Sequence, residues 1–314
     1  MEARGNLEEK GDNLEWALCL SQEAPESISW EKLKRSQVEE QINPGKPPFS
    51  FLWDDEALPT AICFSRLYLG DEFCQHLIPS QAQVDRALQF AQAEGLALSL
   101  VTPYVTDEGI DRLRALFSYL ALHCPDAEVI VSDWGTLRLL RREYPSLVPV
   151  LGRILCKMTR DLSLAPPERR PAVPPAASRA LRRPALSLPL YQRFLAGLGI
   201  QRAELDLPPQ GLDMTGIGLK VSLHLPYGYV TTGRACPIGS LDRPKREKFR
   251  PMDHCPGPCQ QVAVELLPSA SVRLFYRGNT VFYRYSQEMV REALALARAE
   301  KVNRVVLHPS PEPK

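Results

Sequence analysis

Three of the chain's eight cysteines lie in one irregular segment, at a spacing that suits a metal site. Cys236 is followed by 18 residues and Cys255, and Cys255 is followed by three residues and Cys259. The Pro-Gly-Pro run between the last two cysteines favours a tight turn that would bring their sulfurs together. Thiolates are soft metal ligands, and a loop lets them converge without straining a helix or strand. The segment therefore predicts a metal site with three thiolates, which needs a fourth ligand.

Cys74 is the best fourth ligand, and His254 is the alternative. Cys74 comes just after a predicted strand that ends in Tyr-Leu-Gly, and sites in α/β barrels are built at the carboxyl ends of strands. His254 would make a Cys3His zinc site. Adjacent residues in an extended chain point apart, so His254 and Cys255 are an awkward pair, and we interpret His254 as a solvated loop residue. The remaining cysteines have no partner at ligand spacing and are interpreted as buried or incidental thiols: Cys19, Cys63, Cys124 and Cys156.

The elements that would position these cysteines alternate between strand and helix. Helices are predicted to follow Ser80, Thr106, Asp133, Leu188 and Ser286, and the first of these starts with a capping box of Ser80 and Gln83. Strands are predicted at 61–70, 96–101, 128–132, 147–151, 202–207, 219–225, 262–267, 272–277 and 302–308. This alternation predicts parallel strands with crossover helices. No strand is followed by a glycine-rich phosphate motif, which disfavours a dinucleotide-binding sheet. We therefore expect an α/β fold built on a TIM-like parallel barrel.

Two segments interrupt the regular pattern. The first 45 residues contain 10 Asp and Glu against 5 Lys and Arg, and we interpret residues 1–48 as a polar extension that ends in a Pro-rich linker at 44–48. Residues 163–187 contain 6 Pro and 5 Arg, which predicts an extended, flexible insertion because Pro cannot donate a backbone hydrogen bond. The barrel domain is accordingly expected over residues 49–314.

Composition limits the classes of function. The chain has 314 residues, 44% of them hydrophobic and 24% charged, with a formal net charge of +1. Such a balance argues against a protein that coats nucleic acid by bulk charge. The apolar stretches are shorter than the roughly 20 residues of a membrane helix. The acidic start is unlike a secretory signal, so we expect a cytoplasmic protein without disulfides.

Three stretches resemble the collagenase-like peptidase family U-thirty-two. LYLGDEFC, which ends at Cys74, resembles the family's strand, Gly-acid turn and first cluster cysteine. LHLPYGYVTTGRAC ends at Cys236 and resembles its strand with an Arg-x-Cys element. DRPKREKFRPMDHCPGPC carries Cys255 and Cys259 and resembles the segment with the last two cysteines. Within the family, the likeness is strongest to the UbiV/UbiU type of oxygen-independent ubiquinone biosynthesis.

The resemblance implies a TIM-like barrel that holds a four-iron four-sulfur cluster through Cys74, Cys236, Cys255 and Cys259. It also implies oxygen-independent hydroxylation of a quinone precursor, with a small-molecule substrate and a second family-related subunit. RNA-base hydroxylation by a related member is one alternative, and a structural zinc site without a hydroxylation role is another. Peptidase activity is not expected, because the chain has no HExxH or GxSxG motif and no recognisable Ser/His/Asp spacing.

Other polar residues are weaker candidates for site residues. Arg234, two residues before Cys236, could donate to a cluster sulfur or to an anionic substrate. A polar group follows the fourth predicted strand, where barrel sites often place such residues, although a solvated loop is the simpler interpretation: Arg153, Lys157, Arg160 and Asp161.

Overall fold

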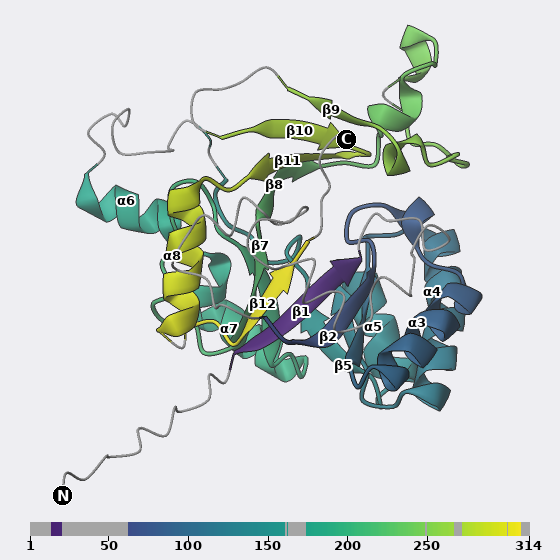
Figure 1. The fold of residues 1–314 in the computed structure, drawn as a ribbon, viewed down its shortest axis with the longest axis horizontal. Coiled ribbons are helices and arrows are strands. Elements are labelled where there is room, and N and C mark those ends of the chain that lie inside the picture. The colour runs from purple at the N-terminus through teal and green to yellow at the C-terminus, as the bar shows by residue number, and fades with distance from the viewer. Residues whose placement is uncertain are drawn as a thin grey trace, which may run out of the picture.

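The computed structural model describes residues 14–20, 62–160, 162, 174–248, 250–266, 272–299 and 301–308. Within them, eight parallel strands close into a barrel in the order β1-β12-β7-β6-β5-β4-β3-β2. Figure 1 shows the barrel with helices packed around it. The predicted TIM-like α/β barrel is therefore confirmed. The strands are β1 Glu15–Leu20, β2 Phe64–Gly70, β3 Ala97–Thr102, β4 Glu128–Val131, β5 Val148–Leu151, β6 Arg202–Asp206, β7 Lys220–Leu225 and β12 Arg304–Leu307.

The helices lie on the outside of the barrel, and all but α6 begin where the sequence signals predict. They are α3 Gln81–Ala93, α4 Asp107–His123, α5 Trp134–Glu143, α6 Pro175–Arg182, α7 Pro189–Gly197 and α8 Gln287–Arg298. The capping box of Ser80 and Gln83 is present at α3, with both reciprocal hydrogen bonds. Asp133 caps α5 by accepting from the backbone N–H groups of Gly135 and Thr136. Such caps satisfy N–H groups that have no partner within the helix.

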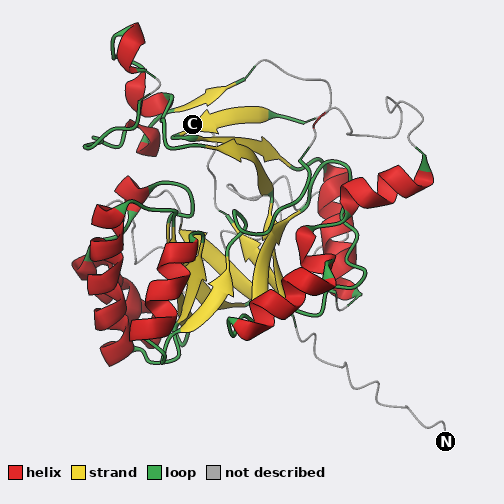
Figure 2. Ribbon diagram, turned by 180° about the vertical axis from the view of Figure 1, so that it is seen from behind, coloured by secondary structure: helices red, strands yellow, loops and turns green. Residues whose placement is uncertain are grey.

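A second, antiparallel sheet follows β7 and lies over the carboxyl ends of the barrel strands. Its order is β8-β11-β10-β9, with β8 Tyr227–Thr232, β11 Thr280–Arg284, β10 Leu274–Arg277 and β9 Ala263–Glu265. Figures 1 and 2 show it on the side of the barrel to which β1 and β12 point. Two of the strands predicted as barrel elements, 262–267 and 272–277, thus belong to this smaller sheet.

Strand β1 corrects the interpretation of residues 1–48 as an extension. Glu15–Leu20 pairs in parallel with both β2 and β12 and is part of the closed barrel. Trp16 and Leu18 pack in the large core between strands and helices, whereas Ala17 and Cys19 lie in a small cluster on the opposite face, inside the barrel. The strand takes its stability from partners far along the chain. The linker expected at 44–48 lies outside the described residues.

The interpretation of residues 163–187 as an extended segment is wrong for its second half. Pro175–Arg182 forms α6, with Pro175 in the first turn, where proline fits because its missing N–H would be unpaired anyway. Ala185–Ser187 forms a short 3-10 turn in which Leu186 is fully buried. Residues 163–173 lie outside the described part. In the described part of the chain, no helix is long and apolar enough to cross a membrane.

Leu186 provides a test of this packing. Its side chain is 0% exposed, whereas that of Leu188, two residues later, is 55% exposed. We expect Leu186→Ala to lower the free energy of unfolding by about 2–5 kcal/mol, because truncating a buried leucine loses transfer energy and leaves a cavity. Leu188→Ala is the control and should change it by less than about 0.5 kcal/mol. Equal midpoints for the two variants in urea unfolding would contradict the packing of this segment.

Candidate functional site

The four cysteines singled out in the sequence line a single pocket of about 110 Å³. Cys74 comes from the loop after β2, and the other three from the segment between β8 and β9. Leu77 and Met252 add apolar walls, while other lining residues are polar: His76, Arg234, Gln260 and Asn279. Residues 162 positions apart in sequence, Cys74 and Cys236, thus share one cavity wall.

Asp71 holds Cys74 in place. Strand β2 ends at Gly70, which has a φ of 113° and whose backbone lies against Val101, so that a Cβ atom there would come within 2.3 Å of the Val101 carbonyl oxygen. Oδ1 of Asp71 then accepts hydrogen bonds from the backbone N–H groups of Phe73 at 2.7 Å and Cys74 at 2.6 Å. Burial raises the pKa of Asp71 to about 6, against the lowering effect of these bonds. The carboxylate thus fixes the turn that presents Cys74.

Cys236 is held by a 3-10 turn, Ile238–Ser240, directly after it. The backbone N–H of Gly239 donates to Sγ of Cys236 at 3.1 Å. A Cβ atom on Gly239 would lie 2.4 Å from Cε of Met252, so glycine allows this close approach. Oγ of Ser240 donates to the carbonyl oxygen of Cys236 at 2.8 Å.

Cys255 and Cys259 flank a tight turn, as the Pro-Gly-Pro run predicts. Gly257 has a φ of 73°, a left-handed conformation that favours glycine. Its N–H donates to Sγ of Cys255 at 3.4 Å. The carbonyl oxygen of Cys259 accepts from Nε of Arg277 at 3.0 Å, which ties this loop to β10.

The sulfurs share an environment that disfavours free thiolates. Burial raises the pKa of Cys74 and of Cys236, and that of Cys259 to about 12, and the mutual proximity of the cysteines raises each further. Neutral thiols are poor nucleophiles. Across the described residues, no three His, Cys, Asp or Glu side chains are grouped so that they could hold a metal ion. His254 is exposed and does not line the pocket.

A second pocket, of about 90 Å³, adjoins the first along Cys74. The side chain of Arg234 lines both pockets, and its guanidinium lies 6.0 Å from the ring centre of Tyr104. Asn279, in the turn between β10 and β11, donates to the carbonyl oxygens of Phe73 and Gly233, each at 2.7 Å. This amide joins the small sheet to the barrel rim at the edge of both pockets.

Arg153 lies in the interior rather than in a solvated loop. It is 2% exposed, and its Nε donates to Oε2 of Glu72 at 2.8 Å. Arg160 likewise pairs with buried Asp206 at 2.8 Å. Lys157 is exposed, and Asp161 lies outside the described residues.

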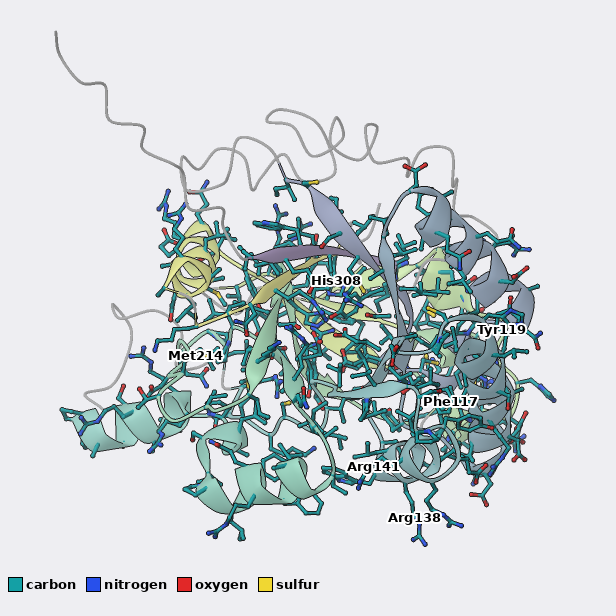
Figure 3. All side chains as sticks on the ribbon, turned by 90° about the horizontal axis from the view of Figure 1, so that it is seen from below. Phe117, Tyr119, Arg138, Arg141, Met214 and His308 are labelled. Carbon is teal, nitrogen blue, oxygen red and sulfur yellow. The ribbon has the colours of Figure 1, made fainter. Side chains whose placement is uncertain are left out.

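A polar cluster that the sequence did not predict lies inside the barrel. Nε2 of His224 lies 2.8 Å from Oε2 of Glu204, and its Nδ1 lies 2.7 Å from Nε2 of His308. All three residues are buried. Figure 3 shows His308 in the middle of the molecule, whereas Arg138 and Arg141 lie at its periphery. The available signal was the alternation in RAELD and KVSLHL, which puts Glu204 and His224 on the face opposite the apolar residues.

The thiol environment predicts an order of chemical reactivity. Iodoacetamide reacts with thiolates, so in metal-free protein at pH 8 the exposed Cys63 should be alkylated at least about tenfold faster than Cys74, Cys236 or Cys259, whose pKa values burial raises. Mass spectrometry of peptides after timed quenching measures each rate. Rapid labelling of any of the three buried thiols would instead indicate an activated cysteine of the kind that peptidases use.

Comparisons with known proteins add no family. No protein-family model matches the chain, and no curated protein matches it. One similar solved structure is dihydropteroate synthase (FolP) from Thermus thermophilus, with 13% identity and a TM-score of 0.39 over 95% of this chain and 89% of that one. The spore cortex-lytic enzyme SleL from Bacillus megaterium has 9% identity and a TM-score of 0.36, over 93% and 70%. A glycoside hydrolase family 18 N-acetylglucosaminidase from Paenibacillus barengoltzii has 9% and 0.34, over 94% of each chain. These scores carry no argument about the site of this chain.

Proposed function

We propose that this chain holds one four-iron four-sulfur cluster through Cys74, Cys236, Cys255 and Cys259, and that it acts in oxygen-independent hydroxylation of a small molecule as one subunit of a pair. The observation that carries the proposal is the convergence of these four cysteines, out of eight, on the wall of one pocket. The resemblance of the cysteine motifs to the U-thirty-two peptidase family supplies the reaction class.

The chemistry of the pocket fits such a cluster. Four thiolates are its usual protein ligands, and they surround a body of several atoms instead of converging on one ion. The sulfurs of Cys236 and Cys255 already accept N–H groups from Gly239 and Gly257, and hydrogen bonds to ligand sulfurs tune reduction potential. Leu77 and Met252 supply an apolar wall beside the sulfurs. When bound, the cluster would supply one-electron transfer.

The chain's own residues provide a place for a substrate beside Cys74. The adjoining pocket has an aromatic wall of Phe73 and Tyr104 and a cationic edge at Arg234. Its wall also includes the amide of Asn279, which the small sheet holds in position through its bonds to the rim. This arrangement suits a planar molecule with an anionic group, bound by apolar contact and by the guanidinium.

Cysteine replacement tests the cluster. Replacing Cys74, Cys236 or Cys259 by Ser removes a soft ligand, so protein purified without oxygen should lose most of its iron and acid-labile sulfide, together with broad absorption near about 400 nm. Cys63→Ser is the matched control, since Cys63 is exposed and should keep full iron content. Stoichiometric zinc without iron in the unaltered protein would overturn the proposal.

Asp71 is expected to act as a positioning residue for Cys74. Asp71→Ala removes the acceptor of two backbone N–H groups and should lower the free energy of unfolding by about 2 kcal/mol or more. Iron bound per chain should fall with it, because the turn that presents Cys74 loosens. Asp71→Asn keeps an accepting oxygen and should retain most of the iron. Equal iron content in the Ala and Asn variants would show that the turn does not depend on this acceptor.

A further inference from the structure

The interior of this barrel carries charges where such barrels are usually filled by branched aliphatic side chains. Tyr68, Glu204 and Arg304 are buried inside it, with 0%, 0% and 1% exposure. Burying ionisable groups costs free energy even when they are paired, and apolar replacements are often at least as stable. Arg304 also pairs with Glu15 and Glu128, whereas Glu204 calls for a role besides holding the fold together.

An unbroken chain of hydrogen bonds runs through this interior. Nη1 of Arg304 donates to the hydroxyl of Tyr68 at 2.7 Å, and that hydroxyl donates to Oε1 of Glu204 at 3.0 Å. The other carboxyl oxygen, Oε2, lies 2.8 Å from Nε2 of His224, whose Nδ1 lies 2.7 Å from Nε2 of His308. His308 directly follows β12 at the carboxyl end of the barrel. This series of hydrogen bonds thus links the middle of the barrel to its mouth.

Burial keeps both rings neutral and makes the Glu204 carboxyl group a weak acid. Burial raises the pKa of Glu204 to about 7. Burial also lowers the pKa of His224 and that of His308 well below the usual value, and Arg153 lowers both further. The ionisable groups that act on Glu204, or on which it acts, come from several elements: Tyr68, Glu72, Glu128, Cys156, Arg202 and Arg304. Asp206 and Arg304 also act on His224.

We propose that Glu204, His224 and His308 form an acid–base relay that moves a proton between the middle of the barrel and a water molecule at its mouth. His308 lines a pocket of about 10 Å³, together with His224 and Tyr68, and the polar wall of this pocket also includes Glu72 and Arg153. That volume is the room needed by one water molecule, and a site with several polar partners is one that water occupies. The relay lies apart from the cysteine pocket and does not rest on the proposed function.

The proton transfer balances without any redox partner. With Glu204 protonated, its O–H donates to Nε2 of His224, Nδ1–H of His224 donates to Nε2 of His308, and His308 keeps its proton on Nδ1. One proton then moves along each bond. Glu204 becomes a carboxylate, both rings stay neutral with the proton on Nε2, and the Nδ1 proton of His308 passes to the water. The reverse sequence restores the protonated acid.

Nitrogen NMR of histidine-labelled protein tests the relay directly, because protonated and unprotonated ring nitrogens have different shifts. As the pH rises from 5 to 9, we expect His224 and His308 to change together from the Nδ1–H to the Nε2–H form. Both changes should have the same midpoint, at a pH of about 7, which is the pKa of Glu204. Two separate midpoints, protonation of either ring to the imidazolium, or unchanged tautomers across the range would each overturn the proposal. This measurement needs no substitution.

Two variants identify the group that drives the change. Glu204→Gln cannot ionise, so both rings should keep one tautomer at every pH. Glu128→Gln is the matched control, because Glu128 also faces the interior but bonds Arg304 instead of a histidine. Its loss should keep the joint change of both rings and move the midpoint to lower pH, since Glu128 raises the pKa of Glu204. A pH-dependent switch that survives in a folded Glu204→Gln protein would exclude Glu204 as the proton source.

Discussion

Closure of the barrel depends on one buried guanidinium. Arg304 on β12 donates to Glu15 on β1 at 2.6 Å and to Glu128 on β4 at 2.6 and 3.0 Å. It therefore ties the first strand to the last, 289 residues apart in sequence, and reaches across the interior to a third. The hydroxyl of Tyr68, which also accepts from this guanidinium, is in turn directed at Glu204. If either Glu15 or Glu128 is removed, the positive charge of Arg304 loses part of its pairing. An unpaired charge in a low-dielectric interior costs free energy.

Most of the barrel was predictable because its signals are local. The capping box at Ser80, the helix that starts after Asp133 and the apolar strand runs each lie within a few residues of sequence. Strand β1 was not predictable in this way. Its six residues lie in an acid-rich stretch, and its partners β2 and β12 become neighbours only when the barrel closes. Helix α6 was missed because its prolines, Pro174 and Pro175, occupy the start of the helix, where they are tolerated.

The cysteine pocket could be predicted from the sequence, whereas the polar cluster around Glu204 was missed. Cysteine is chemically specific, so the spacing of Cys236, Cys255 and Cys259, with Cys74 after a strand, was enough to predict the residues that share a pocket. Glutamate and histidine are common on surfaces, and burial is what gives the Glu204 cluster its properties. The usable signal is that β6 and β7 alternate, with Glu204 and His224 on the face opposite their apolar residues. Both faces of a parallel strand that helices cover are buried, so these polar residues are buried by their position.

The order of elements also shows how the molecule is assembled. Strand β7, helix α8 and strand β12 form an ordinary strand–helix–strand unit of the barrel, and the whole antiparallel sheet, with three of the four pocket cysteines, is spliced between β7 and α8. The barrel supplies only Cys74 and the rim. Because barrel loops vary while the strands persist, one insertion or deletion between β7 and α8 is enough to add or remove three of the four cysteines together. Loss of the segment would also remove Tyr229 and Tyr285, which donate hydrogen bonds to Asp206 and to the backbone of His224, so the cysteine pocket and the polar interior would change together.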